Sequence, residues 1–482
     1  MEKINGDKAG TLVLGALIAT LVFSISVFTA GCGAITSTTE TQTRTTIPPD
    51  VQGDAASSHP SISADGRLVA FRSDATNLVV GSTNGAHSIY VKDKETGVTT
   101  RASTASDGAN GNRDSDNPVI SADGRFVAFD STATNLAAGD ANNDCLSAAG
   151  TNTNCPDVFI KNLNSGETRI VSASTAGAQG NRDSDHPAIS GDGRYVAFRS
   201  SAANLVTGDG NGKSDIFLKD MQSGAVSRVS VAADGTESNG DCAQPSISTD
   251  GRFVAFLSDA TDLAPDDTNG KIDVYVKDIQ TGALTRVSVG AGGQGNEASG
   301  LGSLAISASG RFVAFDSAAD NLVPDDNNAK RDIFLKDMQS GALSLVSVSA
   351  AGAQGEEDSY SSVSVSADGR WVAFSSDAPN LVPGDTNATS GKTNVFLKDM
   401  QTGALSPVST SSAGIIGQGK SEFASISADG RFVAFDSGAP NLVEGDTNKK
   451  SDVFIKDMQS GTTVRISTST SDTGPGTPVS PG

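Results

Sequence analysis

Short runs of alternating apolar and polar residues recur along most of this chain, and tight turns separate them. Val, Phe, Tyr and Ile fill the runs, which is typical of β-strands. Asp250-Gly251 and the segment 278–282 have the composition of hairpin turns, because Gly adopts the positive φ that such turns need. No convincing helical period occurs in residues 51–467. The pattern predicts four strands in each unit, in one case residues 246–248, 253–257, 274–277 and 283–289.

The four-stranded unit is repeated seven times. The string Ser-Ala-Asp-Gly-Arg, followed by an apolar residue and Val-Ala-Phe, recurs with variations. A second string, which reads Ile-Tyr-Val-Lys-Asp at residues 89–93, closes each third strand. One such sheet cannot bury both of its faces, so neighbouring units in a ring must cover each other. The repeats predict an all-β fold, a seven-bladed β-propeller of four-stranded antiparallel blades. The glycine of the first string lies at positions 66, 124, 193, 251, 310, 369 and 430, and an insertion of 11 residues lengthens copy two.

The repeated string, in the form Ser-Ala-Asp-Gly-Arg-Phe-Val-Ala-Phe at residues 427–435, closely resembles the TolB-like (WD-type) β-propeller repeat. The resemblance covers roughly residues 51–467 and implies the propeller fold. TolB proteins also have an α/β domain before the propeller and fewer blades, and we find no counterpart of that domain here. The propeller of the prolyl oligopeptidases is similar as well, but the hydrolase domain of that family has no counterpart in this sequence. The resemblance therefore implies a fold and no particular activity.

The two ends of the chain differ from the repeats. Residues 12–28 are apolar or small, and Ala30-Gly31-Cys32 follows them. This arrangement resembles a bacterial lipoprotein signal over residues 1–32, in which Cys32 is lipidated. An uncleaved membrane anchor and a plainly cleaved signal are the alternatives, and all three place the body outside the cytoplasm. We expect a Thr-rich tether at 33–50, a disordered tail at 468–482, and a monomer on the periplasmic or extracellular side of the cell envelope.

The charge balance excludes some partners. The chain has 35 Lys and Arg against 56 Asp and Glu, which gives a net charge of −21. Such a surface repels nucleic acid and anionic lipid, so we expect no nucleic-acid ligand and membrane contact only through the N-terminal anchor.

One face of the predicted ring carries the long connections, between strands two and three and between strand four and the next blade. Long loops in a compact domain are usually functional or mobile. The copies differ at several places in these loops, which favours a non-catalytic platform for a protein, peptide or glycan. An enzyme acting on that face, a hydrolase or lyase, is one alternative, and a calcium-stabilised structural envelope protein is another. No nucleophile-elbow or zinc-protease motif occurs, so we expect no enzymatic activity and assign no catalytic residue.

The loop between strands two and three repeats the pattern Asp-x-Asn-x-x-x-Asp. Several oxygens on one tight loop suit calcium, the only cofactor that the sequence suggests. Asp and Asn also stabilise turns by bonding their own backbone, and copy one has Ser at both Asp positions, so turn architecture is the alternative. The candidate ligands are Asp209, Asn211, Asp215, Asp267, Asn269, Asp273, Asp326, Asn328, Asp332, Asp446, Asn448 and Asp452.

The remaining Cys and His residues have limited chemistry. Cys145 and Cys155 flank the insertion in copy two, and a local disulfide is expected in an exported protein. Cys242 is expected to be a partly buried free thiol. His59 and His186 occupy equivalent positions before Pro in copies one and three. They could hold a metal only over the channel, and a surface role is the alternative.

Overall fold

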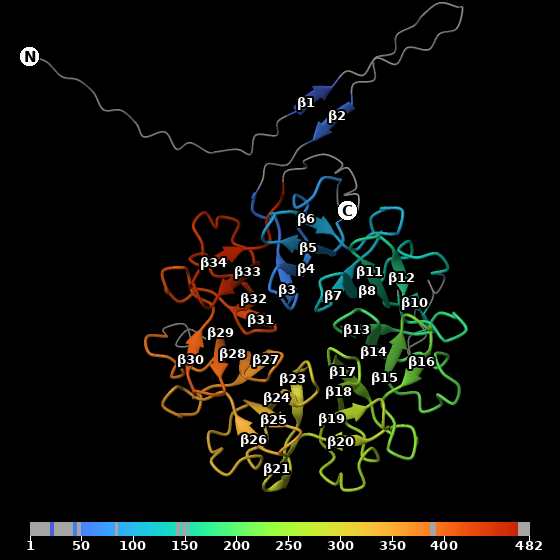
Figure 1. Ribbon diagram of the computed structural model, residues 1–482, viewed down its shortest axis with the longest axis vertical. Coiled ribbons are helices and arrows are strands. Elements are labelled where there is room, and N and C mark those ends of the chain that lie inside the picture. The colour runs from blue at the N-terminus through green and yellow to red at the C-terminus, as the bar shows by residue number, and fades with distance from the viewer. Residues whose placement is uncertain are drawn as a thin grey trace, which may run out of the picture.

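The predicted propeller is confirmed: in the computed structural model, seven four-stranded antiparallel sheets are arranged around a central axis (Figure 1). The structure describes residues 20–23, 42–45, 50–81, 85–140, 145–146, 152–153, 155–385 and 392–470. The innermost strands are β3 (Ser57–Ile62), β7 (Ser115–Ile120), β13 (Ser184–Ile189), β17 (Cys242–Ile247), β23 (Ser299–Ile306), β27 (Ser359–Val365) and β31 (Ser421–Ile426). The second strands are β4 (Leu68–Ser73), β8 (Phe126–Ser131), β14 (Tyr195–Ser200), β18 (Phe253–Ser258), β24 (Phe312–Ser317), β28 (Trp371–Ser376) and β32 (Phe432–Ser437).

The outer half of each blade follows the same order. The third strands are β5 (Ser88–Asp93), β11 (Asp157–Asn162), β15 (Asp215–Asp220), β19 (Asp273–Asp278), β25 (Asp332–Asp337), β29 (Asn394–Asp399) and β33 (Asp452–Asp457). The outermost strands are β6 (Thr99–Arg101), β12 (Thr168–Ile170), β16 (Val226–Arg228), β20 (Leu284–Arg286), β26 (Leu343–Leu345), β30 (Leu405–Pro407) and β34 (Thr463–Arg465). Three two-stranded pairs lie outside the blades: β1 (Thr20–Phe23) with β2 (Gln42–Thr45), β9 (Cys145–Leu146) with β10 (Asn152–Thr153), and β21 (Val289–Gly290) with β22 (Gly293–Gln294).

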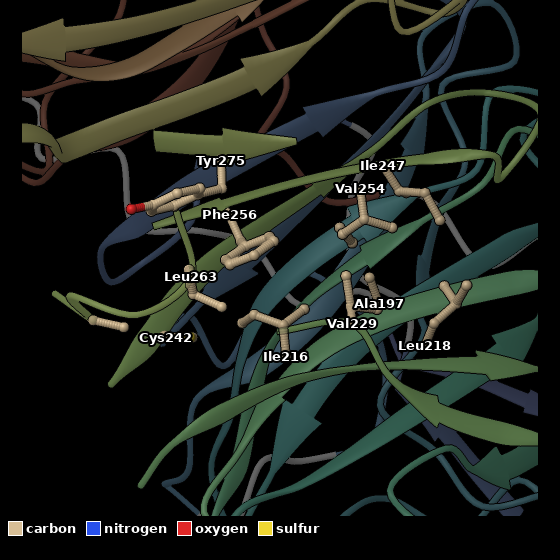
Figure 2. Close-up of a cluster of buried hydrophobic side chains, with 12 residues drawn as sticks. Ala197, Ile216, Leu218, Val229, Cys242, Ile247, Val254, Phe256, Leu263 and Tyr275 are labelled. Carbon is tan, nitrogen blue, oxygen red and sulfur yellow. The ribbon is translucent and has the colours of Figure 1, made fainter. Parts of the chain in front are cut away.

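The core consists of seven hydrophobic clusters, each shared by two adjacent blades. The cluster between blades 3 and 4 joins Ile216 and Val229 to Val254 and Phe256 (Figure 2). Within each blade, the aromatic ring after Val-Ala on strand two lies beside an aromatic ring on strand three, as for Phe198 and Phe217, whose centroids are 5.8 Å apart. Burial of this apolar surface is what holds the ring together.

Two parts of the repeat tie each blade to the one before it. In six blades the tight turn between strands one and two places its Gly against an aromatic side chain of the preceding blade, for example Gly251 against Tyr195, and in blade 2 Gly124 lies against Leu68. The Lys of the closing string is buried and donates to backbone carbonyls of the preceding blade, for example from Lys161 to Thr104 at 3.1 Å and to Ala105 at 3.2 Å. Both features therefore recur because each blade must seal against its neighbour.

The ring is closed by contacts between blade 1 and blade 7, and no blade combines strands from both ends of the chain. Residues 50–53 pair with the segment after β34: Gly53 N donates to Ser467 O at 3.1 Å, and Ser469 N donates to Val51 O at 2.8 Å. Lys92 of blade 1 donates to Thr468 Oγ1 at 2.9 Å. Thr468 and Ser469, which follow the predicted boundary at residue 467, are buried there.

Each inner strand begins earlier than the sequence pattern indicates. In blade 4 the expected strand of residues 246–248 is β17, Cys242–Ile247, whose pairing with β18 shifts register between Ala243 and Ser246. The bulge and Pro245 interrupt the alternation, so the pattern is visible only after them.

Most of both ends lies outside the described residues. This includes Cys32 and residues 471–482, so the predictions of a lipoprotein signal and a disordered tail stay predictions. Among the residues that are described, no helix has the length and apolar character needed to cross a bilayer.

Candidate functional site

Every inner strand carries a bulge near its start, on the long-loop side of the ring, and we call this ring of seven bulges around the propeller axis the channel mouth. In six bulges the third residue of the strand has positive φ, and in blade 5 the residue with positive φ is Gly300, the second residue of β23. Neighbouring bulges meet: the rings of His59 and Phe423 have centroids 4.0 Å apart, and Gln244 Nε2 donates to Leu301 O at 3.4 Å. Bulges re-aim side chains and are frequent beside active sites. The six other bulge residues with positive φ are His59, Asn117, His186, Gln244, Ser361 (with Ser362) and Phe423.

The residue directly after Val-Ala-Phe on the second strand is paired with the bulged region and differs from blade to blade. The sequence patterns described above did not include this position, although it can be seen in the sequence: the invariant Val-Ala-Phe is followed by a residue that is charged in some copies and neutral in others. In the structure two of these side chains, Arg72 and Arg199, are half-buried beside the bulges, and the other five are buried. The seven residues are Arg72, Asp130, Arg199, Leu257, Asp316, Ser375 and Asp436.

Blade 3 holds a compact ion network at this mouth. Arg199 binds Asp185 through two hydrogen bonds, of 2.7 Å from Nε and 2.5 Å from Nη2. His186 Nδ1 lies 3.0 Å from the same carboxylate, and this hydrogen bond raises the pKa of His186. Burial opposes ionisation of Asp185, but the bonds from His186 and Arg199 outweigh it and lower its pKa. The His186 side chain is 48% exposed, so a ligand in the mouth can reach it.

Three buried carboxylates accept hydrogen bonds from residues of the bulges and so hold the bulges in place. Asp130 Oδ1 accepts from Asn117 Nδ2 at 2.8 Å and from the backbone N of His186 at 3.3 Å. Asp316 Oδ1 accepts from the backbone N of Gly302 at 2.9 Å and of Ser303 at 2.8 Å. Burial raises the pKa of Asp130 to about 6.

Asp436 is the third of these carboxylates. Burial, and then the charge of Glu422 on the adjoining strand, raise the pKa of Asp436 to about 8. Proteins keep such acids where a backbone must be held or a proton moved.

The charged and neutral residues form two arcs of the mouth. In blades 1 and 2, Arg72 Nε lies 2.9 Å from Asp116, and His87 Nδ1 lies 2.5 Å from Asp74. With blade 3 these make a charged arc. In blades 4 to 6 the equivalent second-strand residues are Leu257, Asp316 and Ser375, and the bulge of blade 5 presents Leu301, 45% exposed. The residue after Val-Ala-Phe is therefore charged in blades 1 to 3 and neutral in blades 4 and 6, whereas in blade 5 Asp316 is buried behind the bulge, 3.5 Å from Arg331.

The opposite face is regular. On six of the seven blades the Arg of the tight turn pairs with the Asp that ends the third strand, at 2.6–2.9 Å. Because this ion pair is repeated, it fits a structural role. The residues that differ between blades lie instead on the long-loop face.

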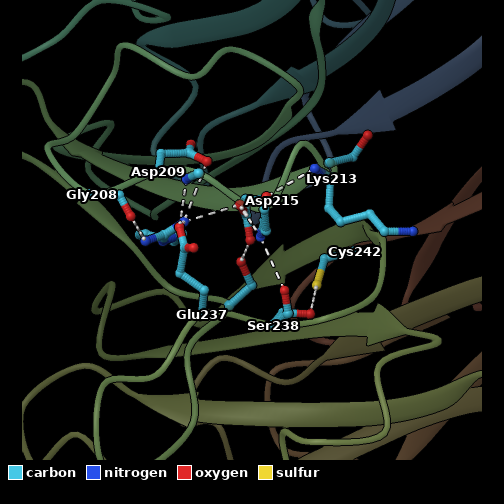
Figure 3. A network of polar contacts seen from close by, with 12 residues as sticks. Gly208, Asp209, Lys213, Asp215, Glu237, Ser238 and Cys242 are labelled. Atoms are coloured by element: carbon cyan, nitrogen blue, oxygen red, sulfur yellow. Dashed lines mark hydrogen bonds and ion pairs between the residues drawn. The ribbon is translucent and has the colours of Figure 1, made fainter.

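The predicted calcium loops lie at the outer edge of the long-loop face, away from the channel. In blade 3, the buried Asp215 accepts from Asn211 Nδ2 at 3.3 Å, and Arg228 Nη1 lies 3.4 Å from Asp209 and 3.3 Å from Asp215 (Figure 3). Glu237 also binds Arg228. The cation between these carboxylates in the structure is thus a guanidinium group.

The acidic pairs of blades 4 and 7 have similar partners. Gln294 Nε2 donates to Asp267 at 2.7 Å and Asp273 at 3.3 Å, with Arg286 beside both. Gln52 Nε2 donates to Asp446 at 2.7 Å and Asp452 at 2.8 Å.

The asparagines of these loops build turns. Asn211 Oδ1 accepts from the backbone N of Lys213 at 2.8 Å, and its Nδ2 donates to Ser238 O at 3.0 Å. Asn269, Asn328 and Asn448 make the same two kinds of bond. Within the described part of the chain, no three His, Cys, Asp or Glu residues are arranged to hold a metal ion. Calcium therefore stays a prediction.

His59 and His186, which precede Pro in the sequence, lie in the bulges of the channel mouth. Burial, then the charges of Arg72 and His186, lower the pKa of His59 to about 4, so it is neutral at pH 7. Cys155 is disulfide-bonded, and because the side chain of Cys145 is outside the described residues, the pairing Cys145–Cys155 stays a prediction.

Cys242 is a free thiol, and it is 1% exposed rather than partly buried. Burial raises its pKa to about 12. Because the thiolate is the reactive species, we expect native protein at pH 7.5 to resist iodoacetamide, whereas protein unfolded in guanidinium is alkylated at Cys242. Mass spectrometry of the peptide measures both. Equal labelling of native and unfolded protein would contradict this burial.

No family model matches this sequence, and none of the curated proteins is similar enough to match. Solved structures with a similar arrangement include TolB from Acinetobacter baumannii, at 16% identity and a TM-score of 0.37 over 66% of this chain and 60% of that chain. A prolyl endopeptidase structure matches at 12% identity and a TM-score of 0.50 over 85% of this chain and 49% of that chain. An oligogalacturonate lyase in complex with manganese matches at 13% identity and a TM-score of 0.47 over 91% and 97%.

This chain thus spans less than two thirds of the TolB and prolyl endopeptidase chains that it resembles. At such low identity the likeness concerns the fold alone. By its structure the chain is a seven-bladed β-propeller.

Proposed function

We propose that this protein is a non-catalytic binding platform that receives a protein, peptide or glycan at the channel mouth. The observation that carries the proposal is the ring of seven bulges, where residues that differ between copies, such as His186 and Leu301, are exposed around the propeller axis. Structural residues of a repeat recur in every copy, as the buried lysines and turn glycines do here. Variation at one place in the ring supports recognition of an asymmetric ligand.

The two arcs of the mouth fit a ligand with polar and apolar parts. Arg199 and His186 can bind carboxylate or hydroxyl groups on one side, while the exposed Leu301 offers apolar contact on the other. The proposal includes a bacterial envelope location with a lipid anchor at Cys32, on the sequence resemblance described above.

Screens with a phage-displayed random peptide library and an oligosaccharide array test this function. We expect ligands whose affinity falls about tenfold or more in Arg199→Gln, because a charged hydrogen-bond donor is lost. The matched control is Arg194→Gln, which breaks the Arg194–Asp220 pair on the opposite face of the same blade. Ligands that bind both variants as well as the wild type, or only lose affinity in Arg194→Gln, would contradict the proposal.

An enzyme is the second candidate, favoured by Asp130. Its pKa of about 6 suits proton transfer near neutral pH, and the ring of His186 is on the adjoining bulge. Turnover of fluorogenic peptides or glycosides that is abolished in Asp130→Asn, with ligand affinity retained, would favour this alternative over the binding platform.

A further inference from the structure

The acidic pairs on the outer loops can be compared between blades, because the repeat places them equivalently. In blades 2, 4 and 7 one glutamine Nε2 bonds to both carboxylates; these glutamines are Gln179, Gln294 and Gln52. In blades 3, 4 and 7 an arginine that ends the outermost strand lies beside the pair; these arginines are Arg228, Arg286 and Arg465. Each pair therefore has an internal donor.

Blade 5 has neither donor. Leu345 stands opposite Phe334, where Arg228 stands opposite Phe217 in blade 3. Gln354 has turned away: its Nε2 donates to Asp325 O at 2.7 Å, and its Oε1 accepts from Asn327 N at 3.3 Å. The two carboxylates of this blade, Asp326 and Asp332, thus face each other without a guanidinium or a bridging amide.

One oxygen of this pair is buried without a partner. Asp326 is 9% exposed, and its Oδ1 has no hydrogen-bond partner. The corresponding Oδ1 of Asp140, Asp267 and Asp446 receives the glutamine amide. Asp332 is fully buried and accepts from Ser347 Oγ and, at 2.8 Å, from Asn328 Nδ2. Burial, and then the charge of Asp332, raise the pKa of Asp326 to about 6.

A buried carboxylate oxygen without a hydrogen-bond partner destabilises the folded protein, and a cation bound between Asp326 and Asp332 would remove that cost. Hard carboxylate oxygens at close range suit calcium, which takes about six to eight oxygen ligands. A hollow of about 560 Å³ adjoins the loop and is lined by Asp325, Asn328, Gln354 and Glu356, among others.

We propose that blade 5 binds one calcium ion between Asp326 and Asp332, at the position that an arginine guanidinium fills in blade 3. Backbone carbonyls and water supply the remaining ligands. The inference is independent of the proposed ligand of the channel mouth, and it reduces the four loops of the sequence pattern to one.

Calorimetric titration of the full chain with calcium chloride, after treatment with chelator, gives the stoichiometry. We expect one calcium per chain and a Tm that rises when calcium replaces chelator. No binding at millimolar calcium, or a stoichiometry of four, would overturn the proposal.

Two substitutions locate the site. Leu345→Arg supplies the missing guanidinium, so we expect a raised Tm in chelator and loss of the calcium response. Asp326→Asn removes the unpaired charge with little change of shape, so it should also lose the response while remaining folded in chelator. A calcium response retained in Asp326→Asn would overturn the proposal even if Leu345→Arg fails to fold.

The reciprocal variant is Arg228→Leu in blade 3. It removes the guanidinium that lies between Asp209 and Asp215, so the stoichiometry should rise from one to two. A folded Arg228→Leu protein that still binds one calcium would contradict the equivalence of the two positions.

Discussion

Gly251→Ala is expected to destabilise the propeller strongly, although it adds one methyl group. Gly251 has φ of +75°, and a Cβ there would lie 2.3 Å from Cδ2 of Tyr195 on the preceding blade. The left-handed backbone costs an alanine about 1–2 kcal/mol, and overpacking adds about 1–3 kcal/mol. We therefore expect a loss of about 2–5 kcal/mol in the free energy of unfolding, measured by urea denaturation.

The control for this prediction lies in the same blade. Gly282 has φ of +77°, but a Cβ there would meet nothing within 4 Å. Gly282→Ala should show the backbone cost alone, so the difference between the variants measures the seal between blades 3 and 4. Gly124→Ala should be intermediate, because its neighbour is the flexible Leu68 side chain at 2.8 Å. Equal losses in Gly251→Ala and Gly282→Ala would contradict the packing argument.

Asp436→Asn is expected to stabilise the protein at alkaline pH. The pKa of Asp436 is about 8 in the folded protein, against an ordinary value of 3.8. Between these values the folded protein keeps a proton that the unfolded chain has released. The contribution of this proton to the stability of the folded protein is thus complete below pH 4 and is lost as the pH rises through 8. At about 1.4 kcal/mol per pKa unit, the upper limit is about 5–6 kcal/mol.

Chemical denaturation from pH 5 to pH 9 tests this dependence. The wild type should lose stability as the pH rises across this range, whereas Asp436→Asn should be flatter and more stable at pH 9. Glu422→Gln should move the proton release of Asp436 to lower pH, since the charge of Glu422 raises that pKa. Asp457→Asn is a control whose effect on stability has the opposite sign. The bond from Arg431 lowers the pKa of Asp457, so the ionised carboxylate stabilises the fold and its removal should lower the free energy of unfolding. An Asp436→Asn variant as pH-dependent as the wild type would contradict the prediction.

The position of the channel mouth could be predicted only in part. The long-loop face follows from the repeat, because tight turns and long connections alternate along each copy. The histidines before Pro were visible, but their assignment to the surface or the channel was open. The bulge aims His59 and His186 at the channel, and a bulge changes side-chain direction without a distinct sequence signal. The meaning of the varied residue after Val-Ala-Phe appears only when seven blades are arranged around one axis.

The acidic loops illustrate the same limit. The spacing of Asp209, Asn211 and Asp215 is consistent with a calcium loop or with a turn. In blade 3 the cation beside the acidic pair is Arg228, which follows Asp215 by 13 residues and lies on another strand. In blade 7 the residue that bonds to the pair is Gln52, 394 residues from Asp446.

The sequence by itself determined the number of blades, the four strands of each blade and the tight turns that join them. These depend on local alternation, turn glycines and a period, which are properties of neighbouring residues. Only the tertiary structure decided which carboxylates are neutralised and which side chains share the channel mouth. Burial and charge act through space, between residues that closure of the ring brings together from distant parts of the chain.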